Sequence, residues 1–354
     1  MNGPTLPIGP RLVGPGHPCL VVAEISANHN QNLSRAIEII RAAKRAGADA
    51  VKLQTYTADT LTIDSDREYF RVPSGTLWSG KTLHQLYREA YTPWEWHEQL
   101  FATAREEGLI CFSTPFDAAA VELLEVLAAP VHKIASFELV DIPLLEKIGQ
   151  TGKPVIASVG MATLSEIDEA VSTLRRTGAG PIALLKCTSA YPASPATMNL
   201  RTIPHLQSTF GVVAGLSDHT MGGAVAVAAV SLGASIVEKH LTLSREDGGP
   251  DAAFSMEPDE FTRIVADIRQ AEQALGSVVY TRSKEEEKSV VFRRSLFVVQ
   301  DVAIDEKFTT QNIRSIRPGF GLPPRFMSTV LGRTASRGLS RGTPLSWDDI
   351  GPRP

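Results

Sequence analysis

The fold is decided by LVVAEI at residues 20–25, a helical pattern over residues 33–46 and AVKL at residues 50–53. The first run is apolar except for Glu24, as expected of a strand buried on both faces. Apolar residues then recur at helical spacing from Leu33, and Gly47 marks the end of that helix. A strand, a helix and a second strand in this order form one βαβ unit with parallel strands.

This alternation continues as far as residue 275. Further strands are predicted at residues 109–112, 131–135, 155–158, 182–186, 212–215 and 236–239, and further helices at residues 93–107, 117–127, 164–176, 222–232 and 261–275. Eight strand–helix units fit a closed (β/α)8 barrel without remainder, although an open doubly wound sheet repeats the same unit. The prediction is therefore an α/β TIM barrel over residues 20–276.

The remaining segments have other compositions. Residues 1–19 form an N-terminal extension rich in Pro and Gly, and residues 56–91 form a long insertion after the second strand, rich in Thr, Ser, Gly and aromatics. A loop this long in a compact domain is usually functional or disordered, and its place after a strand puts it over the catalytic face. Residues 277–292 are a charged linker, and residues 293–351 predict a small, basic, β-rich domain that faces an anionic substrate or is simply a solvated surface.

Composition narrows the class of protein. The formal net charge of −4 gives no case for nucleic acid or an anionic membrane as partner. No apolar run approaches the roughly 20 residues that span a bilayer, and the N-terminus lacks a signal-peptide pattern. Three scattered cysteines are too few for a disulfide framework. A cytoplasmic enzyme is the simplest expectation.

Polar side chains gather where the predicted strands end, which is where the active site of a parallel barrel lies. Lys52 and Lys133 are costly to bury unless they meet an anion. Hydroxyl groups stand near them at the other strand ends: Thr114, Ser136, Ser158 and Ser217. Together these groups suit a phosphate or a phosphorylated carboxylate. Lysines that reach solvent separately, or a Schiff-base lysine, are the alternatives.

Two histidines, His219 and His240, end the adjacent seventh and eighth strands. Neighbouring strand ends are close enough for both imidazoles to bind one metal ion, with His29 a less certain neighbour. Oxygen ligands, Glu24 among them, suit Mn²⁺ or Mg²⁺ better than a closed zinc site, because no thiolate is near. Asp251 follows the eighth strand as a loop carboxylate, for which turn formation is the alternative role.

Taken together, these residues resemble the sialic acid synthase family. The motifs are AEISANHN (23–30), VKLQ (51–54), STPF (113–116), KIAS (133–136), SVGM (158–161), SDHT (217–220) and EKH (238–240), and NIRSIRPG (312–319) resembles the family's antifreeze-like (SAF) domain. The insertion, with GTLWSGKTL (75–83) and YTPWEW (91–96), is similar to the pseudaminic acid synthase branch, as is Ser189 in CTSAYP (187–192), where sialic acid synthases tend to have Asn.

The resemblance implies a role for each matching residue. Phosphoenolpyruvate would be bound by Lys52, Thr114, Lys133, Ser136, Ser158, Ser189 and Ser217. His219 and His240 would hold Mn²⁺ or Mg²⁺, Glu24 would be the acid/base carboxylate, and Asp251 would act beside it. Tyr191 and Asp251 would face the sugar, together with Arg317, or else Arg314, from the second subunit of a domain-swapped homodimer.

The implied reaction is the condensation of phosphoenolpyruvate with 2,4-diacetamido-2,4,6-trideoxy-L-altrose, an amino sugar, with release of phosphate. N-acetylneuraminate and legionaminic acid synthases are the alternatives within the family. A Schiff-base aldolase on the same barrel and a non-catalytic sugar-binding protein are the alternatives outside it. Buried charges argue against the non-catalytic reading, because they are costly without a function.

Overall fold

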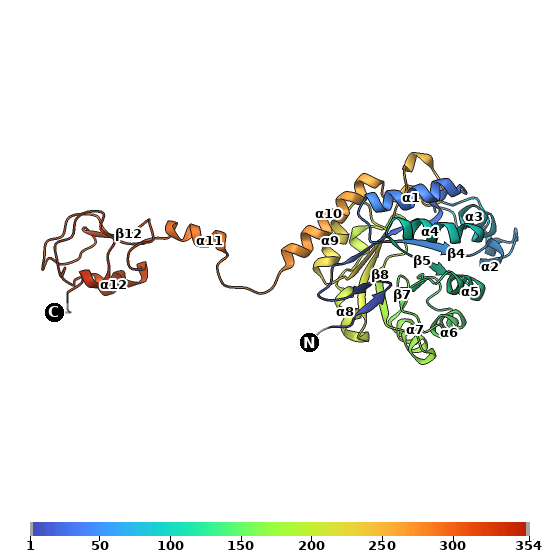
Figure 1. The fold of residues 1–354 in the computed structure, drawn as a ribbon, viewed down its shortest axis with the longest axis horizontal. Helices are drawn as coiled ribbons and strands as arrows, with labels where there is room; N and C mark the ends of the chain where they lie inside the picture. Colours follow the sequence, from blue (N-terminus) through green and yellow to red (C-terminus); the bar gives the residue numbers. More distant parts are fainter. Residues whose placement is uncertain (1–2, 352–354) are drawn as a thin grey trace. The chain divides into compact units, whose positions relative to one another are not determined.

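Eight parallel strands close into a barrel in the computed structural model, which describes residues 3–351 (Figure 1). The strands are β3 (Leu20–Glu24), β4 (Ala50–Thr55), β5 (Ile110–Pro115), β6 (His132–Ile134), β7 (Val155–Ser158), β8 (Ile182–Cys187), β9 (Val213–Asp218) and β10 (Ile236–His240). The last strand pairs with the first, with His240 opposite Glu24. The predicted TIM barrel is confirmed, and the open sheet is wrong because the closed barrel has no edge strand.

A helix follows each strand and packs outside the barrel (Figure 1). These helices are α1 (Leu33–Arg45), α4 (His97–Glu106), α5 (Ala118–Val126), α6 (Ile142–Gly149), α7 (Leu164–Thr177), α8 (Thr202–Phe210), α9 (Ala224–Ser231) and α10 (Pro258–Leu275). Side-chain caps fix several of their first turns, for example Asn32 on α1 and Thr163 on α7. The expected helices fall close to these bounds, whereas α6 and α8 were not predicted.

The barrel interior has an apolar floor and a polar upper layer. Successive residues of a strand point to opposite faces, so alternate residues face the interior. Towards the amino ends of the strands, the buried apolar residues that pack together include Leu20, Val22, Phe112, Ile156 and Ile236. The next interior positions, two residues further towards the carboxyl ends of the strands, are polar: Glu24, Lys52, Thr114, Ser158 and Glu238. The polar interior residues therefore lie only towards the carboxyl ends of the strands, where the active site of a parallel barrel is expected.

The N-terminal extension closes the floor of the barrel. Strands β1 (Leu6–Ile8) and β2 (Arg11–Val13) form an antiparallel hairpin. Leu6, Ile8 and Val13 are fully buried and join the same apolar cluster as the lower barrel residues. Arg11 adds an ion pair with Asp49, at the start of β4. The sequence did not predict this hairpin.

The insertion after β4 has structure of its own. It contains two short helices, α2 (Ala58–Leu61) and α3 (Leu83–Ala90). Thr82 caps α3 by accepting a hydrogen bond from the amide of Gln85, and Arg71 and Thr82 form an isolated bridge. Trp78 donates a hydrogen bond from its indole nitrogen to the carbonyl of Pro250, 2.7 Å away. The insertion is thereby tied to the loop that follows β10.

The chain divides into two compact units between Gly276 and Ser277. The second unit begins with α11 (Lys284–Ser289), which carries the charged run of the predicted linker. It continues with β11 (Ser295–Val298), antiparallel to β12 (Ile313–Ile316), and the short helix α12 (Met327–Val330). A small apolar core supports it, centred on Leu296, Phe308, Ile313 and Val330. No helix in the described part of the chain is long and apolar enough to cross a membrane.

Candidate active site

A cavity of about 560 Å³ opens at the carboxyl end of the barrel strands. Its lower wall consists of the polar upper layer of the barrel, and its upper wall consists of the insertion and the β10–α10 loop. The lining residues predicted from sequence are Glu24, Lys52, Lys133, Ser136, Ser158, Tyr191, Ser217, His219, His240 and Asp251. Ser189 and Thr114 lie beside the cavity and outside its direct lining. Arg317 is exposed and lies on the second unit, directly after β12, as Arg314 does on β12 itself.

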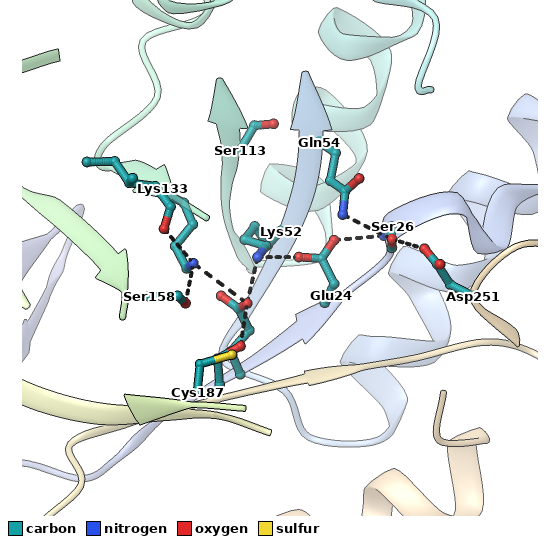
Figure 2. A network of polar contacts seen from close by, with 12 residues as sticks. Glu24, Ser26, Lys52, Gln54, Ser113, Lys133, Ser158, Cys187 and Asp251 are labelled. Atoms are coloured by element: carbon teal, nitrogen blue, oxygen red, sulfur yellow. Dashed lines mark hydrogen bonds and ion pairs between the residues drawn. The ribbon is translucent and has the colours of Figure 1, made fainter. Parts of the chain in front are cut away.

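Two buried lysines and two buried carboxylates form the base of the cavity (Figure 2). The Lys52 ammonium lies 2.5 Å from Glu24 Oε2 and 2.6 Å from Glu238 Oε1. Lys133 donates to Ser158 Oγ at 2.7 Å, and its ammonium lies 4.0 Å from Glu238. Four charges in one network balance one another, which is the condition for burying them.

Burial and neighbouring charges set the protonation of this network. Burial lowers the pKa of Lys52 to about 8, although the adjacent Glu238 favours its charged form. Burial also opposes ionisation of Glu238, but Lys133 and Lys52 outweigh it and hold its pKa well below the usual range. At neutral pH the base of the cavity therefore presents the ammonium of Lys52 together with an ionised Glu238.

Hydroxyl groups surround the lysines. Ser217 donates to Glu238 Oε1 at 3.3 Å, and Ser136 Oγ accepts from the amide of Gly160 at 3.1 Å. A Cβ placed on Gly160 would lie 2.6 Å from Ser136 Oγ and 2.4 Å from Ser189 Oγ, so only glycine leaves these hydroxyls room. Thr114 Oγ1 is buried and has no hydrogen-bond partner within residues 3–351. The group has the donors that a bound anion requires.

The two predicted metal-binding histidines come together. Their ring centroids are 5.4 Å apart. Nδ1 of His219 lies 3.1 Å from the carbonyl of Thr188, an arrangement in which Nδ1–H donates and Nε2 is free to bind a metal. Burial, followed by the charges of His219 and Lys52, holds the pKa of His240 well below its usual range, so its ring is neutral. Its buried Nδ1 has no hydrogen-bond partner among the described residues.

These features fit a metal ion bound by two imidazoles. The expectation that no thiolate is near is wrong, because Cys187 lines the cavity and its Sγ lies 3.9 Å from His219 Nδ1. Within residues 3–351, no group of three or more His, Cys, Asp or Glu side chains is arranged to hold one. Any ion here would therefore take its other ligands from solvent or substrate. The expected contribution of Glu24 is directed elsewhere, because that carboxylate pairs with Lys52. His29 is not a neighbour: it packs against Trp96 and lies 3.3 Å from Thr92 Oγ1.

The upper cavity contains the residues expected to face the sugar. The Tyr191 ring lies 4.5 Å from the His219 ring and 4.9 Å from that of Phe254. Asp251 accepts hydrogen bonds from Ser26 Oγ and from the amide of Ala27 (Figure 2). Burial raises the pKa of the Asp251 carboxyl. Asp251 does lie in a turn, directly before the 3-10 helix Ala252–Phe254, but its carboxylate makes no cap hydrogen bond there and lines the cavity.

Other lining residues were not among the predicted site residues. Glu238 and Gln54 stood in the quoted motifs, but nothing in their spacing distinguished them from Lys239 and Asp218. Strand parity does distinguish them. Lys239 points away from the interior and pairs with Asp218 at 2.8 Å between the barrel and its helices. Glu138 also lines the cavity, and burial raises its pKa to about 7. Its Oε2 finds no hydrogen-bond partner in the described structure.

Comparison with known proteins shows similarity to sialic acid and pseudaminic acid synthases along most of the chain. A model of the NeuB family matches residues 39–280, and a model of the SAF domain matches residues 293–351. The chain is 47% identical over 334 residues to the pseudaminic acid synthase of Helicobacter pylori, covering 94% of this chain and 98% of that protein. It is 43% identical to the pseudaminic acid synthase of Campylobacter jejuni, covering 93% and 96%. The crystal structure of the N-acetylneuraminic acid synthetase from Leptospira borgpetersenii is similar with a TM-score of 0.72 and 29% identity, covering 81% and 95%.

These relatives, together with the charged upper layer of the barrel and its paired imidazoles, identify the chain as an enzyme rather than a non-catalytic sugar-binding protein. The chain belongs to the NeuB family and ends in a SAF domain. It is a transferase that forms a carbon–carbon bond. The resemblance deduced from the ordered motifs is confirmed.

Proposed function

We propose that the chain is a pseudaminic acid synthase, which condenses phosphoenolpyruvate with 2,4-diacetamido-2,4,6-trideoxy-L-altrose and releases phosphate. The observation that carries the proposal is the pair of buried lysines beside the two imidazoles in one cavity. The identity to pseudaminic acid synthases over most of the chain supports the choice of sugar.

Phosphoenolpyruvate would occupy the base of the cavity. Lys52 and Lys133 would bind its charges, and the hydroxyls of Ser136, Ser158 and Ser217 would donate to its oxygens. Thr114 and Ser189 would complete the donors from just outside the cavity lining. The ammonium of Lys52 pairs with Glu24 and Glu238 in this structure. When the substrate is bound, Lys52 would pair with the substrate instead, and Glu24 would then be available for proton transfer.

His219 and His240 would hold Mn²⁺ or Mg²⁺, since both are oriented and His240 is neutral. When bound, such an ion polarises the aldehyde of the open-chain sugar as a Lewis acid. The residues of the chain contribute orientation: the carbonyl of Thr188 fixes the ring of His219, and Phe254 packs 5.0 Å from the ring of His240.

The reaction joins C3 of phosphoenolpyruvate to the aldehyde carbon of the sugar. Water adds at C2, and phosphate leaves by cleavage of its bond to C2 as a keto group forms there. Of the two protons of the water, one goes to the aldehyde oxygen, which becomes a hydroxyl, and the other leaves with the phosphate. Glu24 would take the proton of the attacking water, because the amide of Ser26 holds its Oε1 at 2.8 Å while Oε2 faces Lys52. Lys52 and Lys133 would stabilise the departing phosphate.

The upper wall of the cavity suits a deoxy sugar with acetamido groups. The insertion contributes apolar side chains to this wall, among them Leu61, Val72, Leu86 and Tyr87. Val72 and Leu86 are buried. Such a surface stabilises methyl groups and leaves an extra hydroxyl without a partner. Tyr191 and Asp251 provide the polar contacts on the opposite side.

The direct test is release of phosphate from phosphoenolpyruvate with three sugars: the diacetamido-altrose, N-acetylmannosamine and the diacetamido-mannose precursor of legionaminic acid. We expect kcat/KM to be at least about a hundredfold higher for the diacetamido-altrose. A preference for either other sugar would assign the chain to a sialic or legionaminic acid synthase. Inhibition by EDTA and recovery with Mn²⁺ or Mg²⁺ would support the metal requirement, whereas borohydride trapping on Lys52 or Lys133 would favour the Schiff-base aldolase.

We further propose that the protein acts as a domain-swapped homodimer. Arg317 is exposed on the second unit, with a free guanidinium suited to a sugar acid or an acetamido oxygen. In this arrangement Arg317 of one subunit contacts the sugar bound in the barrel of the other. Arg314, three residues earlier and also exposed, is the alternative contact.

A further inference from the structure

Ser26 has a backbone conformation that is unfavourable for its side chain. It lies two residues after the end of β3, is 2% exposed, and has a φ of 48°. Residues other than glycine rarely adopt this left-handed region, because Cβ crowds the backbone. Glycine would adopt the same φ without strain. A serine kept here indicates that its side chain has a use that outweighs the strain.

The contacts of Ser26 show what that use is. Its hydroxyl donates to Asp251 Oδ2 and accepts a hydrogen bond from Gln54 Nε2 at 3.0 Å. Its backbone amide donates to Glu24 Oε1 at 2.8 Å. Figure 2 shows Ser26 lying between these three side chains, which come from three different segments of the barrel. All three line the cavity.

We propose that Ser26 is a positioning residue for the sugar, which fixes Asp251 and Gln54 through its hydroxyl while its amide fixes Glu24. The inference rests on the proposed function, since it concerns how the same cavity orients its second substrate. Ser26 Oγ and the amide of Ala27 both donate hydrogen bonds to Asp251 Oδ2. The other oxygen, Oδ1, is then left for a hydroxyl or amide hydrogen of the sugar.

The two parts of this arrangement can be separated by mutation. Ser26→Gly removes the hydroxyl, relieves the backbone strain and keeps the amide that holds Glu24. Ser26→Ala removes the hydroxyl and keeps the strain. For both variants we expect the KM for the sugar to rise about tenfold, the loss of one hydrogen bond to a charged group. We expect kcat to change less than about threefold and the KM for phosphoenolpyruvate to stay unchanged.

Stability separates positioning from a structural role. Ser26→Gly should be more stable than Ser26→Ala, because both variants lose the hydroxyl and only glycine is unstrained at this φ, whereas both should raise the KM for the sugar equally. Ala128→Gly is the matched control: Ala128 is exposed, has a φ of 54°, and lies after α5, at the opposite end of the barrel. It should relieve similar strain and leave both KM values unchanged.

A double-mutant cycle tests whether Ser26 acts through Asp251. In an Asp251→Ala background, Ser26→Gly should raise the KM for the sugar by much less than tenfold, since the main partner is gone. An unchanged KM in Ser26→Gly alone, or equal effects in both backgrounds, would overturn the inference. The wild type tests the proposed function separately: if it prefers another sugar of the panel, the same comparison is made with that sugar, and if it turns over none, both ideas fall.

Discussion

Glu24 and Glu238 share one lysine but lie in different positions for chemistry. Glu238 sits between Lys52 and Lys133, where its charge keeps both ammonium groups in place. Glu24 is held by Lys52 on one oxygen and by the Ser26 amide on the other. This difference supports the proposal that Glu24 transfers protons, whereas Glu238 would balance the charge of the lysines.

Glu24→Gln should lower kcat by at least about a hundredfold, because an amide cannot take a proton from water. The variant should stay folded, since a glutamine oxygen can still accept the hydrogen bond from the amide of Ser26. Phosphate release and thermal unfolding measure the two effects. Glu122→Gln is the control, as Glu122 pairs with Lys147 on the surface. Near-normal turnover by Glu24→Gln would remove Glu24 from the mechanism.

Glu138 predicts a pH dependence of stability. Burial raises its pKa from 4.5 to about 7 in the folded protein. Between these values the folded state binds the proton more tightly, so the carboxyl makes the protein less stable as pH rises from 4.5 to 7. At pH 8, the free energy of unfolding of Glu138→Gln should therefore exceed that of the wild type by up to about 3 kcal/mol. The variant should accordingly unfold at a higher temperature. At pH 4 the two proteins should unfold alike, and a constant difference at both pH values would contradict this assignment.

At the scale of elements, the positions of the barrel strands could be predicted from the sequence. Which of their polar side chains face the barrel interior could be predicted only in part. Apolar runs such as residues 155–158 matched the strand β7, because buried parallel strands are continuously apolar. The EKH motif at residues 238–240 nevertheless contains an interior residue, Glu238, next to an outward one, Lys239. Counting alternate residues back from the apolar floor would have separated them. The hairpin β1–β2 was missed because three-residue strands are too short for a periodic pattern.

The hairpin should contribute to stability through its buried side. Leu6→Ala should lower the free energy of unfolding by about 2–5 kcal/mol, as expected for a leucine removed from a packed core. Leu12→Ala is the control on the same hairpin, because Leu12 is 41% exposed, and it should cost less than about 0.5 kcal/mol. Denaturant unfolding measures both. Equal, small effects would mean that the hairpin does not seal the barrel floor in solution.

The insertion should govern the choice of sugar. Val72→Thr keeps the shape of a buried wall residue and adds a hydroxyl. We expect the preference for a 6-deoxy sugar over its 6-hydroxy analogue to fall about three- to tenfold, because the added hydroxyl offers the analogue a partner. The ratio of kcat/KM values measures this preference. Val126→Thr, at an exposed position of α5, should leave the ratio unchanged. An unchanged ratio in Val72→Thr would place the recognition elsewhere.

At the scale of the whole molecule, domain swapping predicts complementation. His240→Ala disables the barrel site and Arg317→Ala disables the contribution of the second unit. Full-length chains of the two variants, mixed and reassorted, should recover about a quarter of wild-type activity, because half of the dimers are mixed and each has one complete site. A mixture of His240→Ala and Glu24→Gln should recover none, since both changes lie in the barrel. No recovery in the first mixture would show that Arg317 serves its own barrel, whereas full activity of Arg317→Ala alone would show that Arg317 serves no site.

The hairpin β1–β2 at the floor of the barrel also affects the order in which substrates bind and products leave. Leu6, Ile8 and Val13 fill the floor of the barrel, and the cavity opens at the carboxyl end of the strands. Under the proposed function, phosphoenolpyruvate would bind at the lysines before the larger sugar covers them. The released phosphate would then lie beneath the condensation product until that product leaves. Steady-state kinetics should accordingly follow a compulsory order, with the sugar acid leaving first and phosphate last.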